Sequence, residues 1–230
     1  MGNADIVGDV HRLIVFDLDG TLIDSRRDLA EAANQLLEEL GGAPLREEDI
    51  GRMVGEGAAL LVRRVLSAAG VAETQTALQR FLDLYAGRML HHTRPYPGIP
   101  ESVETARRHA RVAVLTNKPA DQSRRILAGL RLNGLLDDVV GGDGPWPRKP
   151  DPASLLALME RAHATPSSTL LVGDSEIDYT TAGRAAVRCC LAAWGFGYET
   201  FPRERLTADD WIAATPADLT RMLERWVAKF

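Results

Sequence analysis

The sequence predicts an α/β fold, a doubly wound parallel sheet with an inserted α-helical cap subdomain. Two observations support this prediction. Short apolar runs alternate with segments of helical periodicity along most of the 230-residue chain, as in folds where each crossover between parallel strands is a helix. The interval between the first two apolar runs contains only helical patterns, and it is longer than one crossover requires.

The apolar runs read as strands at 13–16, 112–115, 139–140, 170–172 and 190–193, with a weaker one at 211–212. Helical periodicity covers 99–110, 120–130, 152–164 and 177–186, and an amphipathic segment at 216–227 is expected to close the core. Strands that alternate with helices in this way favour a Rossmann-like core with helices on both faces of the sheet.

The long interval contains helical patterns at 25–40, 56–69 and 77–90, separated by turn signals at 41–44 and 70. We therefore expect an α/β catalytic core from 1–21 and 97–230 and a helical cap from 22–96. A cap that starts directly after the first strand is positioned to lie over the strand ends and to select the substrate. The alternative is that these helices simply pack on the core.

The composition is that of an ordinary soluble protein, with 45% hydrophobic and 26% charged residues. A formal net charge of −5 provides no basic surface for nucleic acid, and no apolar run has the length of a membrane span. Residues 1–9 lack the pattern of a signal peptide. The adjacent Cys189 and Cys190 read as small core residues. These observations predict a cytoplasmic enzyme or binding protein.

Asp17 and Asp19 follow the first predicted strand directly, in the run Asp17-Leu18-Asp19-Gly20-Thr21. Ligands of open α/β sheets bind at the carboxyl ends of the strands. Two carboxylates at such an end are candidates for a nucleophile with an acid/base, or for ligands of a hard cation such as Mg²⁺. The alternative is an Asx turn that only ends the strand.

Three further strand ends carry polar residues. Thr116 and Asn117 follow the second strand at the start of a helix, where hydroxyl, amide and backbone N–H groups suit phosphate oxygens. Lys149, one of only three lysines, lies in a proline-flanked turn and is suited to neutralise a phosphoryl group. Asp174 ends a strand and Asp178 follows at helical spacing, so both can reach one site.

In this order the segments resemble the motifs of phosphatases of the haloacid dehalogenase superfamily: Asp-x-Asp-x-Thr, then Thr or Ser, then Lys, then Gly-Asp-Ser-x-x-x-Asp. The resemblance covers nearly the whole chain, and the helical insert is similar to that family's cap. Residues 53–61, 148–152 and 194–197 also resemble the phosphoglycolate phosphatases of this superfamily.

The resemblance implies a Mg²⁺-dependent phosphatase in which Asp17 is the nucleophile and forms an aspartyl-phosphate, while Asp19 is the general acid and base. It implies that Mg²⁺ binds Asp17, the backbone carbonyl of Asp19 and Asp174, with Asp178 supporting the ion directly or through water. The phosphoryl oxygens are then held by the side chains of Thr116, Asn117 and Lys149 and by backbone N–H groups near Leu18 and Gly20.

The substrate suggested by the resemblance is 2-phosphoglycolate, a small phosphorylated metabolite. The cap-loop residues expected to select it are Arg52, Gly55, Glu56 and Gly57, with Arg52 as a contact of the substrate carboxylate. The two glycines permit close approach of the backbone to a ligand, although an ordinary interhelical turn would also contain them. The sequence leaves open whether the chain is a monomer or a homodimer.

Several alternatives remain at this point. Asp19 argues against a dehalogenase, which needs no acid for a leaving alkoxide. No lysine precedes Lys118, which argues against a phosphonate hydrolase with a Schiff-base lysine in the cap. A phosphosugar mutase or a broad sugar-phosphate or nucleotide phosphatase would share the same core residues. A non-catalytic ligand-binding module is the alternative from another class of protein.

Overall fold

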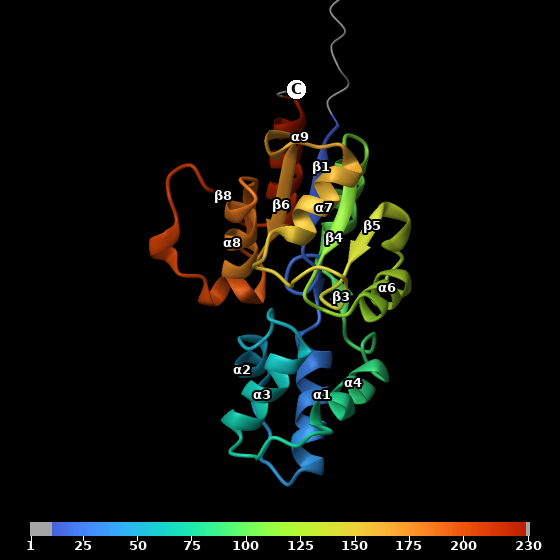
Figure 1. Cartoon of the computed structure of the whole chain (residues 1–230), viewed down its shortest axis with the longest axis vertical. Helices are drawn as coiled ribbons and strands as arrows, with labels where there is room; N and C mark the ends of the chain where they lie inside the picture. The colour runs from blue at the N-terminus through green and yellow to red at the C-terminus, as the bar shows by residue number, and fades with distance from the viewer. Residues whose placement is uncertain (1–10, 229–230) are drawn as a thin grey trace, which may run out of the picture.

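The structure, a computed structural model, describes residues 11–228; the predicted absence of a signal peptide at 1–9 lies outside the described residues. A six-stranded sheet forms the centre, in the order β5-β4-β1-β6-β7-β8, and every neighbouring pair is parallel (Figure 1). Its strands are β1 (Leu13–Phe16), β4 (Arg111–Leu115), β5 (Asp138–Val140), β6 (Thr169–Gly173), β7 (Arg188–Ala192) and β8 (Trp211–Ala213).

Both faces of this sheet are buried. In β1, Ile14 and Phe16 belong to one apolar cluster while Leu13 and Val15 belong to another, as expected when successive side chains point to opposite faces. The first cluster is completed by α5 (Ile99–Arg107), α6 (Ala120–Gly129) and α9 (Pro216–Val227), the second by α7 (Ala153–Ala162) and α8 (Glu176–Arg184). The predicted doubly wound parallel sheet is therefore confirmed.

The long interval after β1 forms four helices that lie below the sheet in Figure 1. A two-stranded antiparallel ribbon, β2 (Ile23–Asp24) with β3 (Arg94–Pro95), joins this helical insert to the core. The helices are α1 (Arg26–Glu39), α2 (Glu47–Gly51), α3 (Ala58–Ala68) and α4 (Ala77–Ala86).

The sequence patterns located most elements within a few residues, and 216–227 coincides with α9. The short helix α2 was not predicted, because its sequence, Glu-Glu-Asp-Ile-Gly, is too short to show a helical repeat of apolar residues. None of the helices within residues 11–228 has the length and apolar character needed to cross a membrane.

Candidate active site

The site begins at Asp17, the first residue after the central strand β1. Its backbone N–H donates to the carbonyl of Val172, 2.8 Å away, so Asp17 stays in register with the end of β6. Because β4 and β6 flank β1 in parallel, the loops that follow these two strands lie on either side of Asp17.

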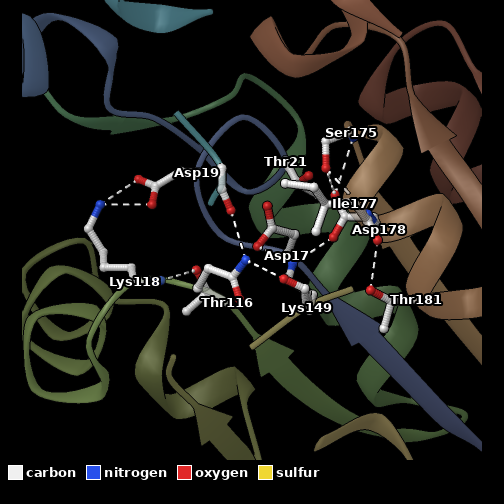
Figure 2. A network of polar contacts seen from close by, with 12 residues as sticks. Asp17, Asp19, Thr21, Thr116, Lys118, Lys149, Ser175, Ile177, Asp178 and Thr181 are labelled. Carbon is white, nitrogen blue, oxygen red and sulfur yellow. Dashed lines mark hydrogen bonds and ion pairs between the residues drawn. The ribbon is translucent and has the colours of Figure 1, made fainter. Parts of the chain in front are cut away.

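Lys149 connects two of the predicted carboxylates. Its ammonium lies 2.8 Å from Oδ1 of Asp17 and 2.6 Å from Oδ1 of Asp178. Figure 2 shows the three side chains together. All three side chains are buried. Burial alone lowers the pKa of Lys149, but the charges of Asp17 and Asp178 outweigh it, so the pKa lies above its usual value and the group stays cationic.

Asp178 is fixed at the start of α8. Its Oδ2 accepts a hydrogen bond from the Ser175 hydroxyl at 2.6 Å. A capping box is formed by the backbone N–H of Ser175, which donates to the same Oδ2 at 3.2 Å, and by the backbone N–H of Asp178, which donates to the Ser175 hydroxyl. A Cβ at Gly173 would lie 2.3 Å from Cγ of Asp178, so glycine there permits the close approach. Both oxygens of Asp178 are thus engaged, one by Lys149 and one by Ser175.

Asp174 lies at the end of β6 in a space made by glycines. Its Oδ2 accepts a hydrogen bond from the backbone N–H of Gly197 at 2.7 Å, and its Oδ1 accepts one from the hydroxyl of Thr21 at 3.3 Å. A Cβ at Gly20 would lie 2.1 Å from Oδ2 of Asp174, and one at Gly195 would also clash. Asp174 therefore has room only because both positions are glycine.

The carboxylates of Asp17, Asp174 and Asp178 converge, with one oxygen of each within 4.8 Å of the others. Burial, followed by the charge of Asp178, raises the pKa of Asp17 to about 7 despite Lys149. Burial and the charges of Asp17 and Asp178 raise the pKa of Asp174 well above its ordinary value. Three buried carboxylates around one ammonium make an oxygen-rich, anionic set that fits a divalent cation.

Asp19 lies across the site with partners of its own. The ammonium of Lys118 lies 2.7 and 2.8 Å from its two carboxylate oxygens (Figure 2), and the buried hydroxyl of Ser25 donates to Oδ1 at 2.5 Å. Ser25 precedes the first cap helix, α1, while Lys118 follows β4, so Asp19 is held by both parts of the chain.

Thr116 and Asn117 lie between these two groups. The hydroxyl of Thr116 accepts from the backbone N–H of Lys118 at 3.2 Å. The side-chain amide of Asn117 donates to the carbonyls of Gly55 and Lys149, each at 2.9 Å, so it ties the cap loop to the core. Its Oδ1 is buried and has no hydrogen-bond partner among the described residues.

A cavity of about 50 Å³ opens beside Asp17 and Asp19. Core residues supply its polar wall, and apolar side chains of the insert supply much of the rest. The lining residues are Asp17, Asp19, Leu29, Val54, Gly55, Gly57, Ala58, Leu61, Phe81, Tyr85, Thr116, Asn117, Lys118, Pro119 and Gln122.

Leu18 and Gly20, predicted as backbone donors to phosphate, form the turn that follows β1. The carbonyl of Leu18 accepts from the N–H of Leu22 at 3.0 Å, and the N–H of Gly20 donates to the carbonyl of Ile23 at 2.9 Å. The N–H of Gly20 itself is used by this turn, and the expectation that backbone N–H groups near Leu18 and Gly20 hold phosphate stays a prediction. Gly20 also matters through its missing side chain and its φ of +88°.

The four cap-loop residues divide into two pairs. Gly55 and Gly57 line the cavity. Arg52 and Glu56 are not among the lining residues. Arg52 pairs with Asp49 at 3.1 Å and with Glu199 at 3.9 Å, while Glu56 pairs with Arg64.

Lys118, Ser25 and Tyr85 are site residues that sequence reasoning did not select. The scarcity of lysine was the available signal for Lys118, which directly follows Thr116 and Asn117. Ser25 and Tyr85 lie within the expected helical segments 25–40 and 77–90, and nothing in those patterns distinguishes a residue that contacts Asp19 or lines the cavity from an ordinary core residue.

Comparisons with known proteins agree with this architecture. The sequence profile of the haloacid dehalogenase-like hydrolases matches residues 14–192. The phosphoglycolate phosphatase of Rhodospirillum rubrum is 42% identical over 197 residues, covering 82% of each chain. That of Aquifex aeolicus is 32% identical over 220 residues, covering 95% of this chain and 100% of its own.

A crystal structure of a Haemophilus somnus protein, described as a predicted phosphoglycolate phosphatase, superposes with a TM-score of 0.85 at 28% identity. The superposition covers 92% of this chain and 97% of that one. The sequence matches and the structural match therefore each cover most of this chain and most of the protein that it is compared with. The chain belongs to the haloacid dehalogenase-like hydrolases.

Proposed function

We propose that the protein is a Mg²⁺-dependent phosphatase that hydrolyses a small phosphate monoester, 2-phosphoglycolate first among them, through an aspartyl-phosphate at Asp17. The observation that carries this proposal is the buried group of Asp17, Lys149, Asp174 and Asp178, whose Asp17 lines a small cavity together with Asp19. Membership of the hydrolase family and the named relatives support the same reaction.

In the first step, a carboxylate oxygen of Asp17 attacks phosphorus and the bond from phosphorus to the leaving oxygen breaks. Asp19 gives its proton to that oxygen, and the alcohol departs. In the second step, a water attacks the phosphorus of the aspartyl-phosphate while Asp19 takes its proton, and the bond to Asp17 breaks. Inorganic phosphate leaves, and both carboxyl groups return to their starting states.

Phosphoryl transfer needs positioning and charge neutralisation more than covalent chemistry. Lys149 holds Asp17 in place and is suited to compensate the charge of the phosphoryl group. Thr116, at the start of the segment that leads into α6, is suited to hold a phosphoryl oxygen through its hydroxyl, whereas Asn117 can do so only through its backbone N–H, because both N–H groups of its side chain already donate to carbonyls. Asn117 also joins the cap loop to the turn of Lys149, so cap position and phosphate site are linked.

Asp17, Asp174 and the backbone carbonyl of Asp19 are the proposed ligands of Mg²⁺. Asp178 supports them indirectly, because Lys149 and Ser175 already engage both of its oxygens. When bound, the ion offsets the charge of the converging carboxylates and lets an anionic phosphate approach an anionic nucleophile. The donor set is all oxygen, as Mg²⁺ prefers.

The size of the cavity supports a small leaving group. A volume of about 50 Å³ holds roughly four water molecules. This room favours a leaving group of few heavy atoms. The free, buried cysteines Cys189 and Cys190 support the proposed cytoplasmic location, since they do not form a disulfide.

The test is Mg²⁺-dependent phosphate release from 2-phosphoglycolate, sugar phosphates and nucleotides, with Asp17→Asn as the inactive control. We expect one small substrate to exceed the others in kcat/KM by at least about a hundredfold. Turnover that requires a sugar bisphosphate would indicate a mutase instead. Activity retained in a correctly folded Asp17→Asn variant would exclude Asp17 as the nucleophile, and no turnover of any substrate would favour a binding module.

A further inference from the structure

Lys118 and Tyr85 form a second polar feature of the cavity, distinct from the phosphate-facing group around Lys149. Lys118 comes from the core and Tyr85 from α4 of the insert, and both line the cavity. The Lys118 ammonium lies 4.8 Å from the centre of the Tyr85 ring, within the range of a cation–π contact. Both side chains are buried.

The hydroxyl of Tyr85 is a buried polar group without a hydrogen-bond partner among residues 11–228. Such a group costs free energy unless a ligand or water satisfies it. Tyr85 is 1% exposed, and the remainder of its surroundings in the cavity is largely apolar, including Leu29, Leu61 and Phe81. Because Tyr85 lines the cavity, a ligand that binds beside it can supply the partner that this hydroxyl lacks.

The ammonium of Lys118 can donate a further hydrogen bond besides those to Asp19. An ammonium has three N–H donors; the bonds to Asp19 account for two of them, and the third lies on the side of Tyr85, where a carboxylate can accept it. The same cavity wall contains no arginine, and Lys118 is its only cationic lining residue within the part of the chain that the structure describes. Among the lining residues, Lys118 is therefore the one that can form an ion pair with an anionic leaving group.

We propose that Lys118 and the Tyr85 hydroxyl form the subsite for a carboxylate on the leaving group, and so select phosphate esters of small hydroxy acids. This inference rests on the proposed phosphatase function and adds the residues that define its substrate class. Lys118 bonds Asp19 and Lys149 bonds Asp17, and both carboxylates line the same cavity as Lys118 and Tyr85, so one small substrate can contact this subsite and Asp17. Neither Arg52 nor Glu56 supplies the charge, because both lie outside the cavity lining.

The test compares 2-phosphoglycolate with ethyl phosphate, which has the same number of carbon atoms but no carboxylate. The readout is the ratio of their kcat/KM values. We expect Lys118→Met to lower this ratio about 30-fold, the value of a charged hydrogen bond, and Tyr85→Phe to lower it about 5-fold. Arg108→Met, at an exposed cation on the opposite end of the core, changes the net charge equally and keeps the ratio.

An equal loss on both substrates in Lys118→Met would overturn the inference, because Lys118 would then serve only to hold Asp19. Binding separates this outcome from a failure of the proposed function. Calorimetry on Asp17→Asn with Mg²⁺ measures Kd for the two compounds without turnover. Tighter binding of 2-phosphoglycolate that Lys118→Met abolishes supports the subsite even if the wild type releases no phosphate, and equal or absent binding of both compounds overturns it.

Discussion

The ammonium of Lys149 lies 2.8 Å from the carboxylate of Asp17, although 132 positions separate the two residues in the chain. This pair brings the only cation of the phosphate-facing group next to the proposed nucleophile. The second bond of Lys149, to Asp178, places three buried carboxylates around one ammonium once Asp174 is included. The electrostatic balance of this group underlies the first two predictions.

Replacing Lys149 by Met leaves buried carboxylates without their cation. We expect the metal-free variant to lose about 3 kcal/mol of unfolding free energy at pH 7.5, and kcat/KM to fall about a thousandfold. Urea unfolding with and without Mg²⁺ checks this, since Mg²⁺ should stabilise the variant more than the wild type. Arg161→Met, which removes an exposed pair with Asp138, is the control with little change. Equal stability of both metal-free proteins would contradict the prediction.

The stability of the metal-free protein should fall as pH rises. Burial raises the pKa of Asp17 from 3.8 to about 7, so between these values the folded state holds a proton that the unfolded state has released. The contribution of Asp17 to the free energy of unfolding is therefore largest below pH 4. It declines by at most about 4 kcal/mol as the pH rises to 7. Urea titrations from pH 4 to 8 should show a shallower decline in Asp17→Asn; parallel curves would refute the assignment.

Gly20→Ala should damage the site through Asp174. The new Cβ would overlap Oδ2 of Asp174, and the φ of +88° is unfavourable for alanine. We expect a loss of about 2 kcal/mol in stability and at least a hundredfold in kcat/KM, with weaker Mg²⁺ activation. Gly183→Ala is the matched control: its Cβ meets nothing within 4 Å in the exposed face of α8, so it should stabilise by about 0.5 kcal/mol.

Arg52→Ala tests the expectation from the sequence that Arg52 contacts the carboxylate of the substrate. Arg52 is half exposed and pairs with Asp49 and Glu199 outside the cavity lining. From this position we expect its removal to change KM for 2-phosphoglycolate by less than about twofold, as for other exposed ion pairs. Steady-state kinetics decide the point. A rise in KM of tenfold or more, restricted to substrates with a carboxylate, would restore Arg52 as the contact.

The sequence by itself determined the sheet, the helical insert and the residue types at the strand ends. Apolar runs and helical periodicity depend on neighbours a few positions apart, so they are visible without a structure. Parallel strands bring their carboxyl ends to one edge, which is why Asp17, Lys149, Asp174 and Asp178 could be expected to meet. Each of these residues follows, or lies near, a strand that the pattern already indicated.

Only the tertiary structure decided which partners each side chain finds. Lys118 faces Asp19 and Tyr85, and Arg52 turns to Glu199, because segments distant in the chain pack together there. No periodicity encodes such contacts, since they depend on the orientation of the insert on the core. The glycines around Asp174 are a further case: the space they leave matters only once the carboxylate occupies it.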